Sequence, residues 1–180
     1  TLGLGGAQSA NYKLAGGTHT LDITRRPITI AASRVYDGTT SLDGTSVSTT
    51  FTYSNIVGSE IITQTGAGSV SSANVASGQS VTLGTIALVD GSGSASNYSL
   101  TSATLDITRR PISLSGTRVY NATTTASSSD LTTLSNLVGS ETLALSNSGT
   151  IANANVGTDK TITIGSLSLG NGSNGGLGSN

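Results

Sequence analysis

The sequence predicts an all-β protein made of two copies of one repeat, and three observations support this fold class. Short alternations of apolar and polar residues recur along the whole chain, which is the period of a half-buried β-strand. β-Branched residues dominate, and no long stretch shows the 3.6-residue period of an amphipathic helix. The stretch TLDITRRPI at residues 20–28 returns unchanged at residues 104–112, which indicates a repeated unit.

The repeat has the size of a small domain. Residues 54–60 (SNIVGSE) return as 135–141 (SNLVGSE), 81 positions later, and the ANV of residues 73–75 returns at the same offset. Arg25 and Arg109 are 84 positions apart, so the copies differ by small loop insertions. A unit of this length is a whole β module rather than one turn of a solenoid.

The boundary between units follows from the side on which the apolar residues lie. Leu105 and Ile107 are odd-numbered, whereas Ile112 and Leu114 are even-numbered, so the buried face changes across the residues TRRP. Proline fixes φ and lacks a backbone donor, which suits the first residue of a new strand. We therefore expect three parts: the terminal strands of a preceding repeat at 1–24, a first full β-sandwich repeat at 25–108, and a second repeat lacking its last strands at 109–180.

Within the first copy, short apolar runs separated by Gly- and Ser-rich turns predict the strands. Residues 36–39 (YDGT) form a turn, since Asp-Gly suits backbone positions with φ above zero. The second copy has YNAT there, and Ala122 in place of glycine predicts a different or a more costly turn. The expected strands are 27–32, 34–36, 46–53, 60–64, 69–72, 80–88, 97–100 and 104–108.

The composition narrows the classes of function. Charged residues make up 9% of the chain, aromatic residues 3%, and the formal net charge is −1. A chain without a basic stripe is a poor partner for nucleic acid, and no apolar run is long enough for membrane insertion. The absence of cysteine excludes disulfides and thiolate-bound metals, and it suits a chain that is exported unfolded.

The chain is not expected to be an enzyme. Its one histidine, His19, aligns with Ala103 of the other copy, so a histidine-dependent triad or metal site would have no counterpart. No cofactor is expected, and calcium is the one ligand considered, because oxygen-rich turns supply its ligands. The candidate calcium ligands are Asp37, Asp43, Asp90 and Asp130, although no DxDxDG loop is present.

The repeated arginine-proline stretch predicts a joint between repeats. Four of the six arginines lie in it, and adjacent side chains of an extended chain point to opposite sides. Each arginine of a pair can therefore hold one neighbouring repeat through carboxylates or loop carbonyls. Alternatively, the arginines are solvated edge charges that oppose aggregation. The expected joint residues are Arg25, Arg26, Pro27, Arg109, Arg110 and Pro111, and the candidate carboxylate partners are Asp22, Asp106, Glu60 and Glu141.

The two ends of the sequence lead to a further expectation. Residues 1–24 match residues 88–108 roughly, but the second repeat stops at Asn180, before its own copy of NYxL and TLDIT. Such a repeat exposes an open sheet edge. It is completed either by tandem continuation of the chain or by strand addition from residues 1–24 of another chain. The expected donor residues are Tyr12, Leu14, Leu21 and Ile23.

The stretches TRRPITIAASRVYDGTT and TRRPISLSGTRVYNATT, each preceded by NYxL and TLDIT, resemble the YDG-type repeats of large bacterial surface proteins, including filamentous-haemagglutinin-like adhesins. The resemblance covers both repeats and the leading tail, and YNA in the second copy departs from YDG. It implies immunoglobulin-like β-sandwiches in an extended tandem array. It also implies export across a Gram-negative envelope to the cell surface or beyond, without an established ligand site in each repeat.

The leading hypothesis is a structural repeat module of a large extracellular bacterial adhesin or filament, giving length and rigidity for surface attachment or a biofilm matrix. Its partners are then adjacent repeats or head-to-tail subunits, with cell-surface or matrix polysaccharide as a further candidate. One alternative is a fibre subunit that polymerises by donor-strand complementation through residues 1–24. Another is a carbohydrate-binding module with recurring tyrosines in a sugar groove, whereas structural tyrosines would pack at sandwich corners. These tyrosines are Tyr12, Tyr36, Tyr98 and Tyr120.

Overall fold

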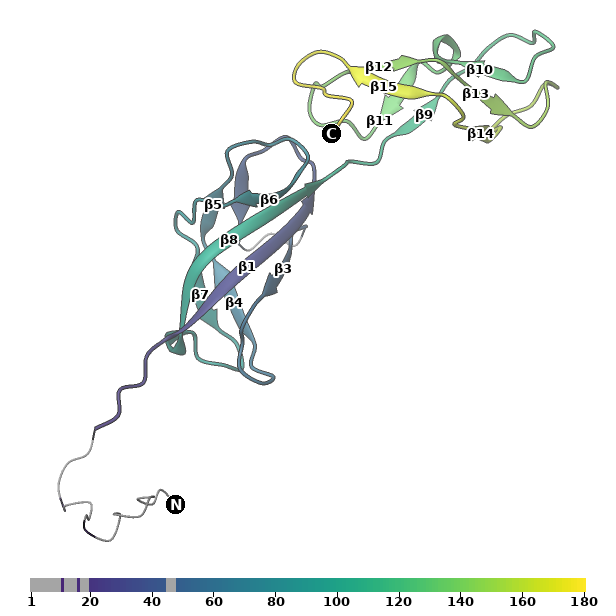
Figure 1. The fold of residues 1–180 in the computed structure, drawn as a ribbon. Helices are drawn as coiled ribbons and strands as arrows, with labels where there is room; N and C mark the ends of the chain where they lie inside the picture. The colour runs from purple at the N-terminus through teal and green to yellow at the C-terminus, as the bar shows by residue number, and fades with distance from the viewer. Residues whose placement is uncertain (1–10, 12–15, 17–19, 45–47) are drawn as a thin grey trace.

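The structure is a computed structural model that describes residues 11, 16, 20–44 and 48–180. It confirms the all-β class, because strands and two short 3₁₀ turns, η2 (Ala95–Asn97) and η3 (Ser128–Asp130), account for its regular elements. Figure 1 shows two groups of strands joined by an extended segment, with the C-terminus beside one end of the first group. Within the described residues, no helix has the length and apolar character needed to cross a membrane.

The first group is centred on two long strands that run parallel. The strand order of its main sheet is β3-β1-β8-β6, and two further pairs, β2-β5 and β4-β7, complete the group. β1 and β8 are parallel neighbours, with Ala32 opposite Leu105 and Arg34 opposite Ile107. The strands are β1 (Arg26–Val35), β2 (Ser41–Asp43), β3 (Thr50–Tyr53), β4 (Ile62–Thr65), β5 (Ala67–Ser69), β6 (Ala76–Ser80), β7 (Ala87–Asp90) and β8 (Tyr98–Thr108).

Alternation along β1 and β8 builds the core of the first group. Every second residue of β1 from Ile28 onward is buried, and the same holds for β8 from Ala103 to Ile107. Leu105 and Ile107 lie in one cluster with Ala32 and residues of the facing strands. Burying such side chains contributes about 1.5–3 kcal/mol each, so β8 supplies a large share of the stability of this group.

The second group consists of shorter strands in small sheets. One sheet has the order β10-β13-β14, and the remaining strands form the pairs β11-β9 and β12-β15. Among the described apolar residues of this group, only Ala126 and Leu131 are buried, whereas Tyr120 and Val156 are exposed. The strands are β9 (Ser113–Ser115), β10 (Thr125–Ser127), β11 (Thr133–Ser135), β12 (Leu143–Ser146), β13 (Ser148–Ile151), β14 (Ile162–Thr163) and β15 (Ser168–Asn171).

The strand positions agree with the expected ones in part. The change of buried face is confirmed, because Leu105 and Ile107 are buried whereas Ile112 and Leu114 are the half-buried residues beyond the arginines. The predicted breaks between strands at residue 33 and at residues 101–103 were wrong. β1 and β8 are each continuous there, and they pair with each other along their length. The expected strand at 80–88 was also wrong: a turn separates β6 from β7, and Ile86 N–H bonds to the carbonyl of Leu83.

Candidate inter-repeat joint

The second arginine of each RRP stretch clamps a turn within its own repeat. Arg26 donates from Nε to the carbonyl of Asn55 at 2.7 Å and from Nη2 to Asn55 Oδ1 at 2.5 Å. Arg110 makes the same pair of bonds to Asn136, at 2.6 and 2.7 Å. Asn55 and Asn136 have φ of 64° and 70°, a conformation that asparagine tolerates better than most residues. Each arginine therefore ties the start of its repeat to a left-handed turn.

The asparagine side chains close the clamp from the other side. Asn55 Nδ2 donates to the carbonyl of Pro27 at 2.8 Å, and Asn136 Nδ2 donates to the carbonyl of Pro111 at 2.7 Å. The two asparagines were missed in the sequence as functional residues. The signal was present, because SN occurs at the same place in both repeats.

Arg110 also reaches back into the first repeat, where it meets a tyrosine from the YDG turn. Its Nη1 donates to the carbonyl of Tyr36 at 3.3 Å. The hydroxyl of Tyr36 donates to Oε1 of Glu141 at 2.5 Å. Tyr36 is only 5% exposed and belongs to the core cluster of the first repeat, and Val138 of the second repeat packs against that cluster. One tyrosine thus contacts both repeats.

A second set of contacts lies at the C-terminus. Asn180 Oδ1 accepts a bond from the backbone N–H of Val75 at 3.1 Å, and its Nδ2 donates to Asn74 Oδ1 at 3.1 Å. The backbone N–H of Arg110 donates to the carbonyl of Asn180 at 2.8 Å, and Arg109 Nε donates to the carbonyl of Ser179 at 3.3 Å. The final residues therefore lie between the arginine pair and the first repeat.

Tyr36 and Tyr98 lie at opposite ends of the first repeat, and different causes raise the pKa of their hydroxyls. Burial, followed by the hydrogen bond to Glu141, raises the pKa of Tyr36 above its ordinary value of 10.0. At the other end, the hydrogen bond to Glu60 is the main cause that raises the pKa of Tyr98. Tyr98 also accepts the backbone N–H of Val57 at 3.1 Å. Both hydroxyls are thus neutral hydrogen-bonding groups at physiological pH.

The structure brings some expected joint residues together and leaves others apart. Arg26, Arg109 and Arg110 bind carbonyl oxygens, whereas Arg25 is exposed. Three of the expected carboxylate partners make other bonds. Glu60 and Glu141 accept from tyrosine hydroxyls, and Asp106 accepts from Ser77 and Gly78. The fourth, Asp22, is exposed. A carboxylate is a better partner in energy, but Arg26 and Arg110 bind the carbonyl oxygens of Asn55 and Asn136 instead.

The expected donor residues are only partly described. Leu21 and Ile23 are 84% and 90% exposed in an extended segment ahead of β1. Tyr12 and Leu14 lie outside the described residues, as does His19.

The YDG turn is organised by the arginine two positions before its tyrosine. Arg34 is 7% exposed, and its guanidinium bonds to the carbonyls of Ser41 and Thr39, both at 2.5 Å. It also forms an ion pair with Asp37 at 3.0 Å. Asp37 in turn accepts from the backbone N–H of Thr39 at 3.0 Å. Gly38 has φ of 76°, which explains the glycine.

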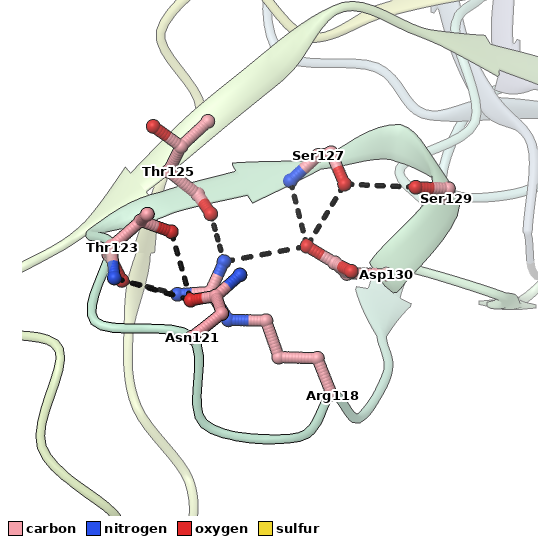
Figure 2. A network of polar contacts seen from close by, with 7 residues as sticks. All are labelled: Arg118, Asn121, Thr123, Thr125, Ser127, Ser129 and Asp130. Atoms are coloured by element: carbon pink, nitrogen blue, oxygen red, sulfur yellow. Dashed lines mark hydrogen bonds and ion pairs between the residues drawn. The ribbon is translucent and has the colours of Figure 1, made fainter.

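The second repeat keeps this turn with different residues (Figure 2). Arg118 donates to the carbonyls of Thr123 and Thr125, and Asn121 accepts from the backbone N–H of Thr123 as Asp37 does for Thr39. The ion pair moves to Asp130, 3.4 Å from Arg118. Ala122 has φ of 62°, a left-handed conformation that is costly for alanine, so of the two predicted outcomes the structure shows the more costly turn.

Asp130 is held by Ser127 as well as by Arg118. The Ser127 hydroxyl and backbone N–H donate to Asp130 Oδ2 at 2.9 and 3.0 Å, and these bonds are the main cause that lowers the pKa of Asp130. The other aspartates considered for calcium lie apart, with Asp90 accepting the backbone N–H of Ala95. Within the described residues, no three His, Cys, Asp or Glu residues gather where they could hold a metal ion.

These features define a β protein built from two like units that share one arginine-clamped junction. Residues 23–105 and 108–180 each match the YDG domain family, and the chain belongs to this family. Comparison with curated proteins finds no match, and comparison with solved structures finds none either.

Proposed function

We propose that this chain is a structural repeat module of a large extracellular adhesin or filament of a Gram-negative bacterium. In this role, tandem immunoglobulin-like β-sandwiches form an extended array that gives length and rigidity for surface attachment or a biofilm matrix. The observation that carries the proposal is the direct bonding across the junction, where Tyr36 of one repeat binds Glu141 of the next.

The junction favours a spacer because several contacts restrain it at once. Linked domains move relative to one another unless their interface is extensive. Here Arg110 bonds to both repeats, Val138 packs on the core of the first, and Asn180 bonds to Val75. Three contacts that surround one extended linker oppose both bending and twisting. An array of such junctions keeps a constant direction over many repeats.

The residues of the joint recur in each repeat, which supports a repeated mechanical role. Arg26 and Arg110 make the same clamp, and Glu60 and Glu141 occupy the same place in the motif SNxVGSE. The tyrosine hydroxyls that a sugar groove would need are engaged in these contacts at Tyr36 and Tyr98. Tyr36 and Tyr98 thus support a structural role over carbohydrate binding, whereas Tyr120 is exposed.

Single-molecule energy transfer across the junction tests the proposal. The natural chain has no cysteine, so cysteines introduced at exposed Ser59 and Thr161 carry the two dyes. We expect a narrow distance distribution that broadens in Arg110→Ala. Arg26→Ala is the matched control, because it removes the same intra-repeat clamp in the first repeat and leaves the junction intact. A broad distribution in the unmodified chain would contradict the spacer role.

A second measurement tests the proposed location. Antibodies raised against the chain should label intact cells of the source organism without permeabilisation. Labelling only after permeabilisation would contradict an extracellular module.

A further inference from the structure

We infer that Asn174 is a site of spontaneous deamidation, and that the carboxylate formed there loosens the junction between the two repeats. The reaction needs only water and the backbone of this chain. The site of modification is independent of the proposed spacer role, whereas the effect on the junction rests on the contacts that support that role.

An asparagine followed by glycine is the dipeptide in which deamidation is fastest, because glycine has no side chain to hinder its backbone nitrogen. That nitrogen gives its proton to water and attacks Cγ of the asparagine. The Cγ–Nδ2 bond then breaks, and Nδ2 takes a proton from water and leaves as ammonia. A water molecule opens the resulting succinimide ring to aspartate or isoaspartate. The sequence contains two such dipeptides, Asn171-Gly172 and Asn174-Gly175.

The second dipeptide forms the centre of a tight turn after β15. Asn174 and Gly175 have φ of 55° and 92°, values that asparagine and glycine adopt more readily than other residues. The backbone N–H of Gly176 donates to the carbonyl of Ser173 at 3.1 Å and closes the turn. The N–H of Gly175 has no hydrogen-bond partner among the residues that the structure describes, and Asn174 is exposed. The attacking nitrogen is therefore free and reached by water.

The first dipeptide has the same sequence but is restrained. The backbone N–H of Gly172 donates to the carbonyl of Gly176 at 2.9 Å. Oδ1 of Asn171 accepts a bond from the backbone N–H of Gly178 at 3.0 Å. Both bonds must open before the nitrogen can reach Cγ. We therefore expect Asn174 to react faster than Asn171.

The first repeat, which includes β8, has the same loop without the reactive dipeptide. Its loop after β7 is closed by a bond from the N–H of Gly91 to the carbonyl of Gly93 at 3.2 Å. The equivalent bond of the second repeat joins Gly172 to Gly176, so the second loop is two residues longer. Residues 174–175 are these additional residues. The modification site is thus an insertion into a loop whose frame both repeats share.

The inserted turn lies beside the glutamate that joins the repeats. Asn174 Nδ2 donates to the carbonyl of Ser140 at 2.9 Å. A Cβ on Gly175 would lie 3.7 Å from Oε1 of Glu141. This oxygen is the one that accepts the hydrogen bond from the hydroxyl of Tyr36. A change at residue 174 therefore acts next to the direct bond across the junction.

Deamidation changes both contacts of the turn. An ionised carboxylate has no donor, so the bond from residue 174 to the carbonyl of Ser140 is lost and two acceptors face each other. The new negative charge also lies close to Glu141, and like charges repel. In isoaspartate the backbone is longer by one carbon atom, which disrupts the turn further. Glu141 is then drawn away from Tyr36 as the protein ages.

Mass spectrometry of the aged chain tests the chemistry. The fresh 180-residue chain is kept in mildly alkaline buffer and sampled over time, then digested with trypsin in heavy-oxygen water, which marks any deamidation that arises during digestion. Cleavage after Lys160 yields residues 161–180, which contain both dipeptides. Fragmentation should show aspartate and isoaspartate forming at residue 174 about fivefold faster than at residue 171, the factor for opening one backbone hydrogen bond of about 1 kcal/mol.

The chain unfolded in urea is the control, because both dipeptides are then unrestrained and should react at similar rates. Equal rates at residues 171 and 174 in the folded chain would overturn the inference. So would a folded chain in which residue 174 stays asparagine while the unfolded chain reacts.

The effect on the junction is tested with the dye pair described above. Asn174→Asp should broaden the distance distribution. Asn171→Asp is the matched control, since it adds the same charge at a position where the first repeat has Asp90, which accepts the N–H of Ala95 at 2.7 Å. Aspartate also tolerates positive φ, and circular dichroism verifies that both variants are folded.

An unchanged distribution in Asn174→Asp, or equal broadening by Asn171→Asp, would overturn the effect on the junction. A broad distribution in the unmodified chain would overturn the spacer role and this effect together. The deamidation of Asn174 is measured separately by mass, so its failure is distinguished from failure of the proposed function.

Discussion

The hydroxyl of Tyr36 in the first repeat donates a hydrogen bond to Oε1 of Glu141 in the second, at 2.5 Å. Tyr36 belongs to the core of its own repeat, where it is 5% exposed. A side chain fixed by its own core and bonded to a neighbour transmits the orientation of one repeat to the next. These contacts support the proposal that the joint is an extension of the two folds rather than a flexible linker.

Removing this bond should uncouple the repeats without unfolding them. In a double-mutant cycle of Tyr36→Phe and Glu141→Ala, we expect a coupling free energy of about 1–2 kcal/mol, the range of hydrogen bonds to charged partners that are partly exposed. Chemical denaturation of the four chains measures it. Tyr98→Phe is the control, because it removes a similar bond to Glu60 within the first repeat. Additive effects of the two joint substitutions would contradict the coupling.

The YDG turns provide a matched pair of substitutions. Ala122 has φ of 62°, so Ala122→Gly should stabilise the second repeat by about 1 kcal/mol. Gly38→Ala should destabilise the first by at least as much, because a Cβ there would also lie 2.9 Å from Cγ1 of Val138. Thermal unfolding followed by circular dichroism measures both. If Ala122→Gly destabilised the second repeat instead, the positive φ of residue 122 would not be what reduces the stability of this turn.

The second repeat should lose stability in acid through Asp130. Its folded pKa lies below the ordinary value of 3.8, mainly because of the bonds from Ser127. The stabilisation is therefore present above the unfolded pKa and is lost as the pH falls through the folded pKa. Asp130→Asn should cost about 0.5–1 kcal/mol at pH 7 and progressively less toward pH 2. If the difference in free energy of unfolding between the unmodified chain and Asp130→Asn did not change with pH, the effect would come from packing and not from the charge of Asp130.

Two isoleucines with identical sequence surroundings should behave differently. Ile107 is 2% exposed and Ile23 is 90% exposed, although both lie in TLDITRRPI. Ile107→Ala should destabilise the first repeat by about 2–5 kcal/mol. Ile23→Ala should leave unfolding of the dilute chain unchanged within about 0.5 kcal/mol. Equal losses of stability would mean that residues 20–24 already pack within the monomer.

Much of the fold could be predicted from local pattern. The alternation of Leu105 and Ile107 against Ile112 and Leu114 located the change of buried face, because period 2 is a property of each strand alone. The parallel pairing of β1 with β8 could not be predicted in this way. It joins residues more than seventy positions apart, and single-strand patterns carry no information about distant neighbours.

The candidate joint could be predicted only in outline. The arginines were visible because they repeat with proline in a chain that has few charges. Their partners were not, because a backbone carbonyl in a left-handed turn, such as that of Asn136, leaves no charge signal in the sequence. Asn180 was also missed, since it ends a Gly- and Ser-rich stretch without apolar periodicity. Its role depends on the backbone path that brings it beside Asn74.

Residual dipolar couplings of the backbone amides test the central claim most directly, that contacts across the junction fix the two repeats relative to each other. In one weakly aligning medium, the couplings of residues 26–44, 48–108 and 110–180 should fit a single alignment tensor in the orientation of Figure 1. Arg110→Ala should split the fit into two tensors of different magnitude. Two different tensors in the unmodified chain would contradict a fixed junction.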